Sequence, residues 1–561
     1  MPTNSSYLTT INQRFARFVF SGPFAVFLIL LGSALRLKHY FENRSLWIDE
    51  AYIAVEITAR TWSEIIRQVP LFVDQVKPPI AFSLIVKSLA VMFGPQEYVL
   101  RLYPLLAGIG SVVLFYYFLK RYASREAAPL ALGLFAVCDA LVYYSAEVKP
   151  YGNDLFVMLV LYGLAEFILR NNDRWWRFLL LAVGGSVAVW LSFSSVFVLG
   201  GLGLVLGVRA LLAGNGKAAG IILGVGLCWL ANFVVLYLGT LDRMLDSEYF
   251  WSFHIWKVNV LSVPLFSWQA LVWLKRIFLS AFQSPVGVIF PSFAAVLFLF
   301  GGYVVFRRDR ARFSVLFAPV LLAILAAILR QYPFASRLIL FVIPAFLVFM
   351  AEGAVGLVRL SRKAAIPAAV VLIGILFYMP VKTNAHYFVA GHSKEEMRPI
   401  MQFMKENFQP GDGIVVTDFA LPQYFYYVSS LPCDYRTPSK ILGLDGGQIL
   451  EGYRLGEITD SVRTREGVHY VPFREIYGIY SKDGFLRRFL VNSKGYKTLF
   501  SHIDFQLVEG GRLWVILPNY QPDMKDFMLG TLGRNGRKLL EFASKRFTIY
   551  LFDMGPRSKS H

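Results

Sequence analysis

The chain has 561 residues, of which 56% are hydrophobic and only 17% are charged. Soluble globular proteins typically carry about 45–50% apolar and about 25% charged residues, so this composition indicates a chain that lies largely in a membrane. It excludes a disordered chain, a collagen and a coiled coil, and three cysteines are too few for a disulfide scaffold. The net charge of +19 is, in so hydrophobic a chain, more typical of cytoplasmic loops than of nucleic-acid binding.

A helix needs about 20 mostly apolar residues to cross a bilayer, and eleven segments of the sequence approach that length. In chain order they are residues 19–36, 98–119, 126–145, 152–169, 178–193, 195–211, 218–238, 284–306, 313–329, 337–358 and 364–381. Only Ser192, Ser194 and Ser195 interrupt the apolar run between the fifth and the sixth. The predicted fold class is a polytopic α-helical membrane protein with about 11 transmembrane helices.

The apolar run 80–93 is interpreted differently, because it is short and carries Lys87. If it lies in the outer interface and does not cross, every basic cluster falls on one side of the membrane. The clusters are Arg14 and Arg17; Lys120, Arg121 and Arg125; Arg170, Arg174 and Arg177; Arg209 and Lys217; Arg307, Arg308, Arg310 and Arg312; and Arg359, Arg362 and Lys363. The positive-inside rule then predicts a multi-pass protein of the cytoplasmic membrane with a cytoplasmic N-terminus.

The sequence changes character after the last span, where charged and apolar residues mix. Strand-like runs lie at Gly413–Thr417, Arg512–Leu517 and Arg546–Phe552, and helical patterns at 394–407 and 419–429. We therefore predict two domains. Residues 1–381 form a transmembrane module with an outer loop at 37–97, and residues 382–561 form an extracytoplasmic α/β domain.

Ionisable residues gather in the segments predicted to lie outside the cytoplasm. They occur in the motifs WIDEAY (47–52), KPP (77–79), YYSAEVKPY (143–151) and RQYPFASR (330–337). The candidate residues are Asp49, Glu50, Tyr52, Lys77, Arg101, Glu147, Lys149, Tyr151, Arg330 and Arg337. An ionisable group beside the membrane is costly, so a cluster of them indicates a functional site.

This combination of residue types fits glycosyl transfer from a lipid-linked donor. Lysine and arginine can hold a phosphate presented at the outer interface, and arginine can bind it through two hydrogen bonds. A carboxylate opposite the leaving group can take the proton of an incoming hydroxyl. No nucleotide-binding fingerprint lies near the predicted cytoplasmic loops, which favours a lipid donor over a sugar nucleotide.

The order of these motifs resembles that of the GT-C membrane glycosyltransferases. The similarity is to the family that includes protein O-mannosyltransferases and lipid A aminoarabinose transferases, and it covers roughly residues 10–380. It depends on WIDEAY, then KPP, then Gly94, Glu97 and Arg101, followed by the 143–151 turn and the stretch YPFASRLILFVIP. The resemblance implies an inverting transfer from a polyprenyl-phosphate sugar to a cell-envelope lipid, glycan or protein, at the outer face of the cytoplasmic membrane.

The resemblance also implies a role for each acidic residue of the first motif. Asp49 would be the general base, and Glu50 its structural neighbour, tied to Arg101. Tyr52 stands where the aminoarabinose branch has an arginine, which argues against aminoarabinose as the sugar.

The cations would hold the donor phosphate. Lys77 matches the lysine of the aminoarabinose branch, and Arg337 with Arg330 would complete the phosphate site. The turn with Glu147, Lys149 and Tyr151 corresponds to one whose bacterial pattern is more often Gln-Glu-Ala-Arg, so Lys149 replaces the usual arginine. No zinc site is predicted, because His386 and His392 lack paired-His or Cys spacing. A divalent metal cofactor stays open.

Simpler roles are open for seven of these candidates. Asp49 and Glu50 could cap a helix, Lys77 could be a solvated loop residue, Arg330 and Arg337 could snorkel to the interface, and Glu147 with Lys149 could be a surface ion pair. Asp412, Asp418 and Asp434 of the tail are interpreted as solvated loop acids.

A transporter or flippase for lipid-linked sugars is the alternative function. It would explain the spans and the outer charges equally well. Transporters, however, tend to show inverted repeats and broken helices near the membrane midplane. Here the ionisable residues gather at the outer ends of the spans, and a large tail on one face suits an enzyme better.

Overall fold

The computed structural model describes residues 22–68, 77–169, 175–241, 258–361, 364–409, 412–417, 420–430, 464–465, 468–473, 476–480, 486–491, 511–520 and 522–554. The chain forms two compact units. The helical unit comprises Met1–Asn43, Val76–Leu89 and Tyr98–His392. The sheet unit comprises Arg44–Gln75, Ala90–Glu97 and Ser393–His561. Much of the predicted outer loop therefore packs with the C-terminal segment.

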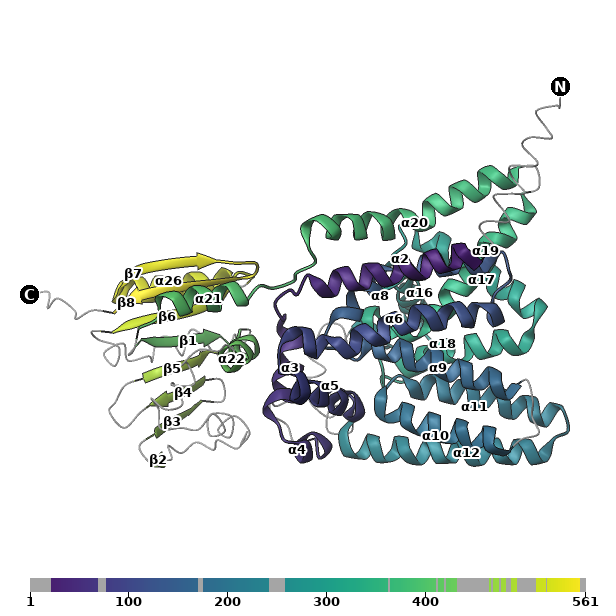
Figure 1. The fold of residues 1–561 in the computed structure, drawn as a ribbon, viewed down its shortest axis with the longest axis horizontal. Coiled ribbons are helices and arrows are strands. Elements are labelled where there is room, and N and C mark those ends of the chain that lie inside the picture. Colours follow the sequence, from purple (N-terminus) through teal and green to yellow (C-terminus); the bar gives the residue numbers. More distant parts are fainter. Residues whose placement is uncertain are drawn as a thin grey trace, which may run out of the picture. The chain divides into compact units, whose positions relative to one another are not determined.

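The helical unit is a bundle whose helices run alongside one another (Figure 1). The helices are α2 (Gly22–Phe41), α5 (Ile80–Phe93), α6 (Glu97–Tyr122), α7 (Ala127–Val137), α8 (Asp139–Tyr143), α9 (Tyr151–Leu169), α10 (Trp175–Leu191), α11 (Ser195–Leu212), α12 (Gly216–Leu236), α16 (Trp268–Gln283), α17 (Pro291–Arg308), α18 (Arg310–Ile328), α19 (Ile343–Leu360) and α20 (Ala365–Ala390). Short 3-10 turns lie at Tyr144–Ala146 and Ser336–Val342, and a π-helical turn at Tyr237–Leu241. Each of the eleven predicted segments overlaps one or more of these elements.

Seven helices of the described residues are long and apolar enough to cross a membrane. The helical segments Ala127–Val137 and Asp139–Ala146, bent by 54° relative to each other, would provide an eighth span if they cross together.

The helix α5 has 14 residues, about 21 Å of helix, which is shorter than the ~30 Å hydrocarbon layer. The Tyr40 hydroxyl near the end of α2 donates to the Tyr98 carbonyl of α6 at 2.9 Å. The chain therefore leaves α2 and enters α6 at the same end of the bundle. The polytopic fold class is confirmed.

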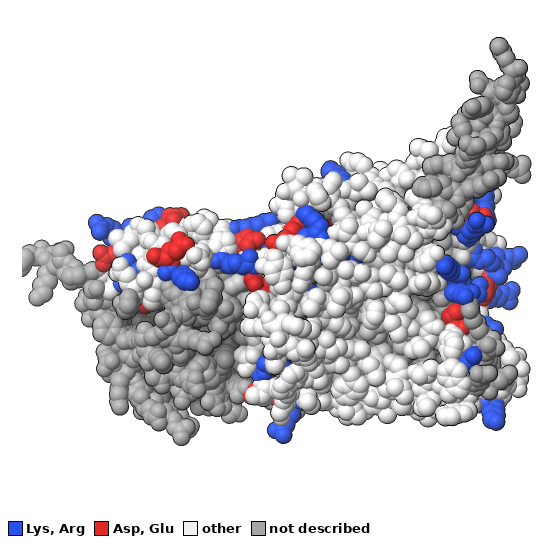
Figure 2. Space-filling view, in the orientation of Figure 1, with Lys and Arg blue, Asp and Glu red and all other residues white. Residues whose placement is uncertain are grey.

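Basic residues collect at the other end of these helices. Glu352 of α19, only 2% exposed, accepts hydrogen bonds from Arg308 Nη1 at 2.8 Å, from the Ser124 amide at 2.5 Å and from the Ser124 hydroxyl at 3.1 Å. Arg359 pairs with Glu126 at 3.1 Å. Figure 2 shows Lys and Arg side chains gathered at one end of the helical unit. The described basic loops therefore share one side, and their cytoplasmic location stays a prediction. Arg14, Arg17, Arg170, Arg174, Arg362 and Lys363 lie outside the described residues.

Replacing Glu352 should destabilise the bundle more than replacing an exposed ion pair. Glu352→Ala leaves the Arg308 guanidinium and the Ser124 amide without their buried acceptor, so we expect a loss of about 2 kcal/mol in the free energy of unfolding. Thermal unfolding of the detergent-solubilised protein measures this loss of stability. Arg359→Gln is the control, because its pair with Glu126 has side chains 59% and 45% exposed, and it should cost less than about 0.5 kcal/mol. Equal losses would contradict the prediction.

The sheet unit contains an eight-stranded sheet with the order β2–β3–β4–β5–β1–β6–β8–β7 (Figure 1). The strands are β1 (Gly413–Thr417), β2 (Thr464–Arg465), β3 (Val468–Phe473), β4 (Ile476–Tyr480), β5 (Leu486–Val491), β6 (Arg512–Pro518), β7 (Arg537–Ala543) and β8 (Phe547–Asp553). Strand β1 is parallel to both β5 and β6, and the other pairs are antiparallel. The helices are α3 (Ile48–Ala59), α4 (Trp62–Ile66), α21 (Arg398–Asn407), α22 (Leu421–Ser430) and α26 (Pro522–Asn535). The predicted α/β character is confirmed.

A buried ion pair ties β1 to β6. Asp412, directly before β1, accepts hydrogen bonds from the Arg512 guanidinium at 2.9 and 2.7 Å and from the Trp514 indole at 2.7 Å. The hydrogen bond with Asp412 raises the pKa of Arg512. The Asp412 side chain is 3% exposed, so its interpretation as a solvated loop acid is wrong. Asp418 and Asp434 lie outside the described residues.

Candidate active site

The predicted site residues are divided between the two units. Asp49, Glu50 and Tyr52 belong to α3 of the sheet unit. The others belong to the helical unit: Lys77, Arg101, Glu147, Lys149, Tyr151, Arg330 and Arg337.

Asp49 and Glu50 occupy the first turn of α3. Glu50 is fully buried and Asp49 is half-buried. The residue before the helix, Trp47, provides no side-chain cap. Instead the Glu395 carboxylate accepts a hydrogen bond from the Ile48 amide at 2.8 Å. The helix end thus has an acidic cap from a distant part of the chain, and Asp49 is not needed for that role.

Glu395 lies in a buried polar environment. Gln423 of α22 donates to the same carboxylate oxygen through Nε2 at 2.6 Å. Burial raises the pKa of the Glu395 carboxyl, and the nearby charge of Asp49 raises it further, whereas the bond from the Ile48 amide acts in the opposite direction. The sequence analysis missed Glu395 and Gln423. The one available signal was the acidic pair Glu395-Glu396 after the last span.

The helical unit brings three of its predicted residues together at the 143–151 turn. Arg337, at the start of the 336–342 turn, hydrogen-bonds with the Tyr144 hydroxyl, and Glu147 and Tyr151 lie beside that tyrosine. The Arg337 guanidinium is 5.8 Å from the Tyr151 ring centroid. Glu147 is fully buried and Lys149 is 9% exposed, which argues against the surface ion pair considered above.

A second layer of polar side chains adjoins this turn in α9. The Tyr103 hydroxyl donates to Asn153 Oδ1 at 2.5 Å, and Asn153 Nδ2 donates to the Leu191 carbonyl at 2.7 Å. The Ser192 and Ser194 hydroxyls hydrogen-bond with each other at 3.1 Å, and both lie near the Asp154 carboxylate. In the sequence these serines signalled only a break between two spans. The structure places the two hydroxyl groups of this break near a carboxylate.

The remaining cations have other surroundings. Arg101 of α6 is 1% exposed. Lys77 is half-buried and lies three residues before α5, which packs on α6 through Phe82 and Tyr103, whose ring centroids are 5.7 Å apart. Arg330 is exposed, and its Nε donates to the Leu261 carbonyl at 2.6 Å. Arg330 therefore contacts the backbone of Leu261, whereas Arg337, Tyr144, Glu147 and Tyr151 form what we call the Arg337 cluster.

Chemically, the Arg337 cluster can hold an anion, and the start of α3 presents a carboxylate that can accept a proton. In the described part of the chain no three His, Cys, Asp or Glu side chains are grouped to hold a metal ion. The predicted meeting of Asp49 with the cations, including the tie between Glu50 and Arg101, stays a prediction.

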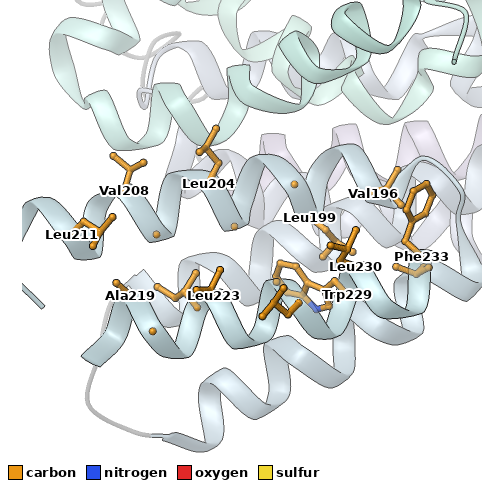
Figure 3. Close-up of a pocket in the computed structure, with 18 of the residues that line it drawn as sticks. Val196, Leu199, Leu204, Val208, Leu211, Ala219, Leu223, Trp229, Leu230 and Phe233 are labelled. Carbon is orange, nitrogen blue, oxygen red and sulfur yellow. The ribbon is translucent and has the colours of Figure 1, made fainter. Parts of the chain in front are cut away.

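A groove of about 880 Å³ lies between α11 and α12 (Figure 3). Its lining is apolar, with Leu204, Val208, Leu223 and Leu230 among the side chains. The indole N–H of Trp229 donates hydrogen bonds to backbone carbonyls of α10. This lining suits hydrocarbon and offers little to the hydroxyl groups of a sugar, so the groove is not the candidate catalytic pocket.

A family model described as dolichyl-phosphate-mannose-protein mannosyltransferase matches residues 76–225. This range includes Lys77 and the 143–151 turn, and it excludes Asp49 and Arg337. Among curated proteins, none matches the chain.

Solved structures show a similar fold. ArnT from Cupriavidus metallidurans, bound to undecaprenyl phosphate, has a TM-score of 0.50 at 12% identity, over 93% of this chain and 97% of that one. Its apo form has a TM-score of 0.51 at 13% identity, over 94% and 98%. The Archaeoglobus fulgidus oligosaccharyltransferase, at 13% identity over 72% of this chain and 61% of that one, has a TM-score of 0.44, too low to support an argument. The predicted resemblance to GT-C membrane glycosyltransferases is confirmed.

Proposed function

We propose that this chain, a multi-pass membrane protein with the GT-C fold, is an inverting glycosyltransferase. It moves a sugar from a polyprenyl-phosphate donor to a hydroxyl of an envelope lipid, glycan or protein, at the outer face of the cytoplasmic membrane. The observation that carries the proposal is the Arg337 cluster, in which a guanidinium bonded to Tyr144 lies near a buried carboxylate, Glu147. The solved ArnT structure bound to undecaprenyl phosphate supports the donor class.

In the proposed step Asp49 accepts the proton of the acceptor hydroxyl while that oxygen attacks the anomeric carbon. The bond from this carbon to the phosphate oxygen breaks, and polyprenyl phosphate leaves with the electron pair. Arg337 and Lys77 stabilise the phosphate charge that develops. Glu147, Lys149 and Tyr151 shape the turn around it, and Arg101 and Glu50 support the loop.

The proposed function includes a division of the chain into two domains. Residues 1–381 form the transmembrane module, and residues 382–561 the domain outside the cytoplasm. Because residues 44–68 belong to the same compact unit as the C-terminal segment, the outer domain and the outer loop act as one body in this proposal.

The test is sugar transfer by the purified protein in lipid nanodiscs. Polyprenyl-phosphate sugars with a radiolabelled sugar serve as donors, and envelope lipids and glycans from a deletion strain serve as acceptors. We expect label on an acceptor together with release of polyprenyl phosphate. Movement of labelled donor across proteoliposomes, with no sugar transferred, would instead support the transporter and contradict the proposal.

A further inference from the structure

The segment directly before Asp49 is held by several contacts with the C-terminal part of the sheet unit. The Leu46 amide donates to the Tyr427 hydroxyl at 2.8 Å. The Ser45 hydroxyl donates to Glu396 at 2.6 Å. The Lys394 ammonium lies 3.6 Å from the Trp47 ring centroid. Four consecutive residues, 45–48, therefore each contact either residues 394–396 or α22.

The contact next to Asp49 is the hydrogen bond between the Ile48 amide and Glu395. A helix begins with amide groups that have no partner inside the helix, and a carboxylate bound there also interacts favourably with the helix dipole. Glu395 provides this carboxylate to the Ile48 amide at 2.8 Å. It thereby fixes the backbone from which the Asp49 side chain projects.

Glu395 is itself held from a second direction. Gln423, fully buried in α22, donates to the oxygen that binds Ile48, and α22 packs against α3. Glu395 is 3% exposed. Burying a carboxylate is costly unless it makes hydrogen bonds. The bond from Ile48 ties Glu395 to α3, and the bond from Gln423 ties it to α22, the helix packed on α3.

We infer that Glu395 is the positioning residue for Asp49, and that the C-terminal segment holds the outer loop in its working geometry. The inference rests on the proposed function, because it assigns Glu395 a role in the reaction through Asp49. Glu395 does not touch the substrate in this scheme. Its effect is to keep the Asp49 carboxylate where the acceptor hydroxyl arrives, since a displacement of about 1 Å is enough to slow a reaction about 100-fold.

The experiment compares Glu395→Ala, Glu395→Gln and the control Asp412→Asn. Asp412 is a second buried carboxylate of the same unit, but its partners are Arg512 and Trp514. We expect Glu395→Ala to lower kcat about 30-fold while the KM for the donor changes less than about 3-fold. Glu395→Gln should retain most of the activity, because its amide oxygen can still accept from Ile48. Asp412→Asn should lower the melting temperature and leave kcat within about 3-fold of the wild type.

Hydrogen exchange provides a readout that does not need activity. The amides at 48–51 should exchange at least about 10-fold faster in Glu395→Ala than in the wild type. In Asp412→Asn their exchange rates should be unchanged. Unchanged exchange and unchanged kcat in Glu395→Ala would overturn the inference, as would equal kcat losses in Glu395→Ala and Asp412→Asn. If the wild type transfers no sugar, the proposed function and the catalytic role of Glu395 are both wrong. Faster exchange in Glu395→Ala would then show only that Glu395 holds the start of α3.

Discussion

Replacing Asp49 with asparagine should lower kcat for sugar transfer by about 1000-fold while the protein still folds and inserts into the membrane. Asparagine has nearly the same shape as aspartate, but its amide cannot take the proton of the acceptor hydroxyl. The cap of α3 is supplied by Glu395, so the helix should keep its start. Single-turnover transfer in nanodiscs measures the loss, and the melting temperature reports the fold.

The matched control is Glu64→Gln in the next helix of the same loop. Glu64 belongs to the capping box of α4, where its carboxylate accepts from the Thr61 amide at 2.8 Å. A glutamine oxygen can accept the same bond, so activity should stay near that of the wild type. Transfer by Asp49→Asn at more than about a tenth of the wild-type rate would remove Asp49 as the base.

The spans were predictable because the signal for them is long and local. A run of about 20 apolar residues needs no tertiary information to be recognised, and the same is true of short β-branched runs such as Gly413–Thr417. The helix α16 shows the limit of that signal. Its sequence is interrupted by Lys275 and Arg276, and none of the eleven predicted spans covers it. Its buried side, with Trp273 and Ile277, is defined only by the packing of the bundle.

The site was predictable only in its composition. The motifs identified Arg337, Glu147 and Tyr151, and the helical unit brings these together. The contact between Glu395 and Ile48 joins residues 347 positions apart, and no pattern in the sequence signals it. A buried carboxylate with partners from distant elements looks, in sequence, like any acid of a polar tail. For the same reason Asp412 was misinterpreted.

Replacing Arg337 should weaken the use of the donor, and the two obvious replacements should differ. Arg337→Ala removes both the charge and the hydrogen bond to Tyr144, so we expect kcat/KM for the donor to fall about 100-fold. Arg337→Lys keeps the charge but offers a single ammonium. It cannot bind the phosphate through two parallel bonds while also bonding to Tyr144, and a loss of about 10-fold is expected.

The control for charge alone is Arg359→Ala at the opposite end of α19. Arg359 is exposed and paired with Glu126, and its removal should leave kcat/KM within about 2-fold of the wild type. Tyr144→Phe tests the positioning of the guanidinium, since it removes the hydroxyl that bonds Arg337 and retains the cation. We expect a smaller loss than for Arg337→Ala, and one that appears mainly in kcat/KM for the donor. If Arg337→Ala left donor affinity unchanged while acceptor affinity fell, the phosphate would bind elsewhere, and the cluster would belong to the acceptor.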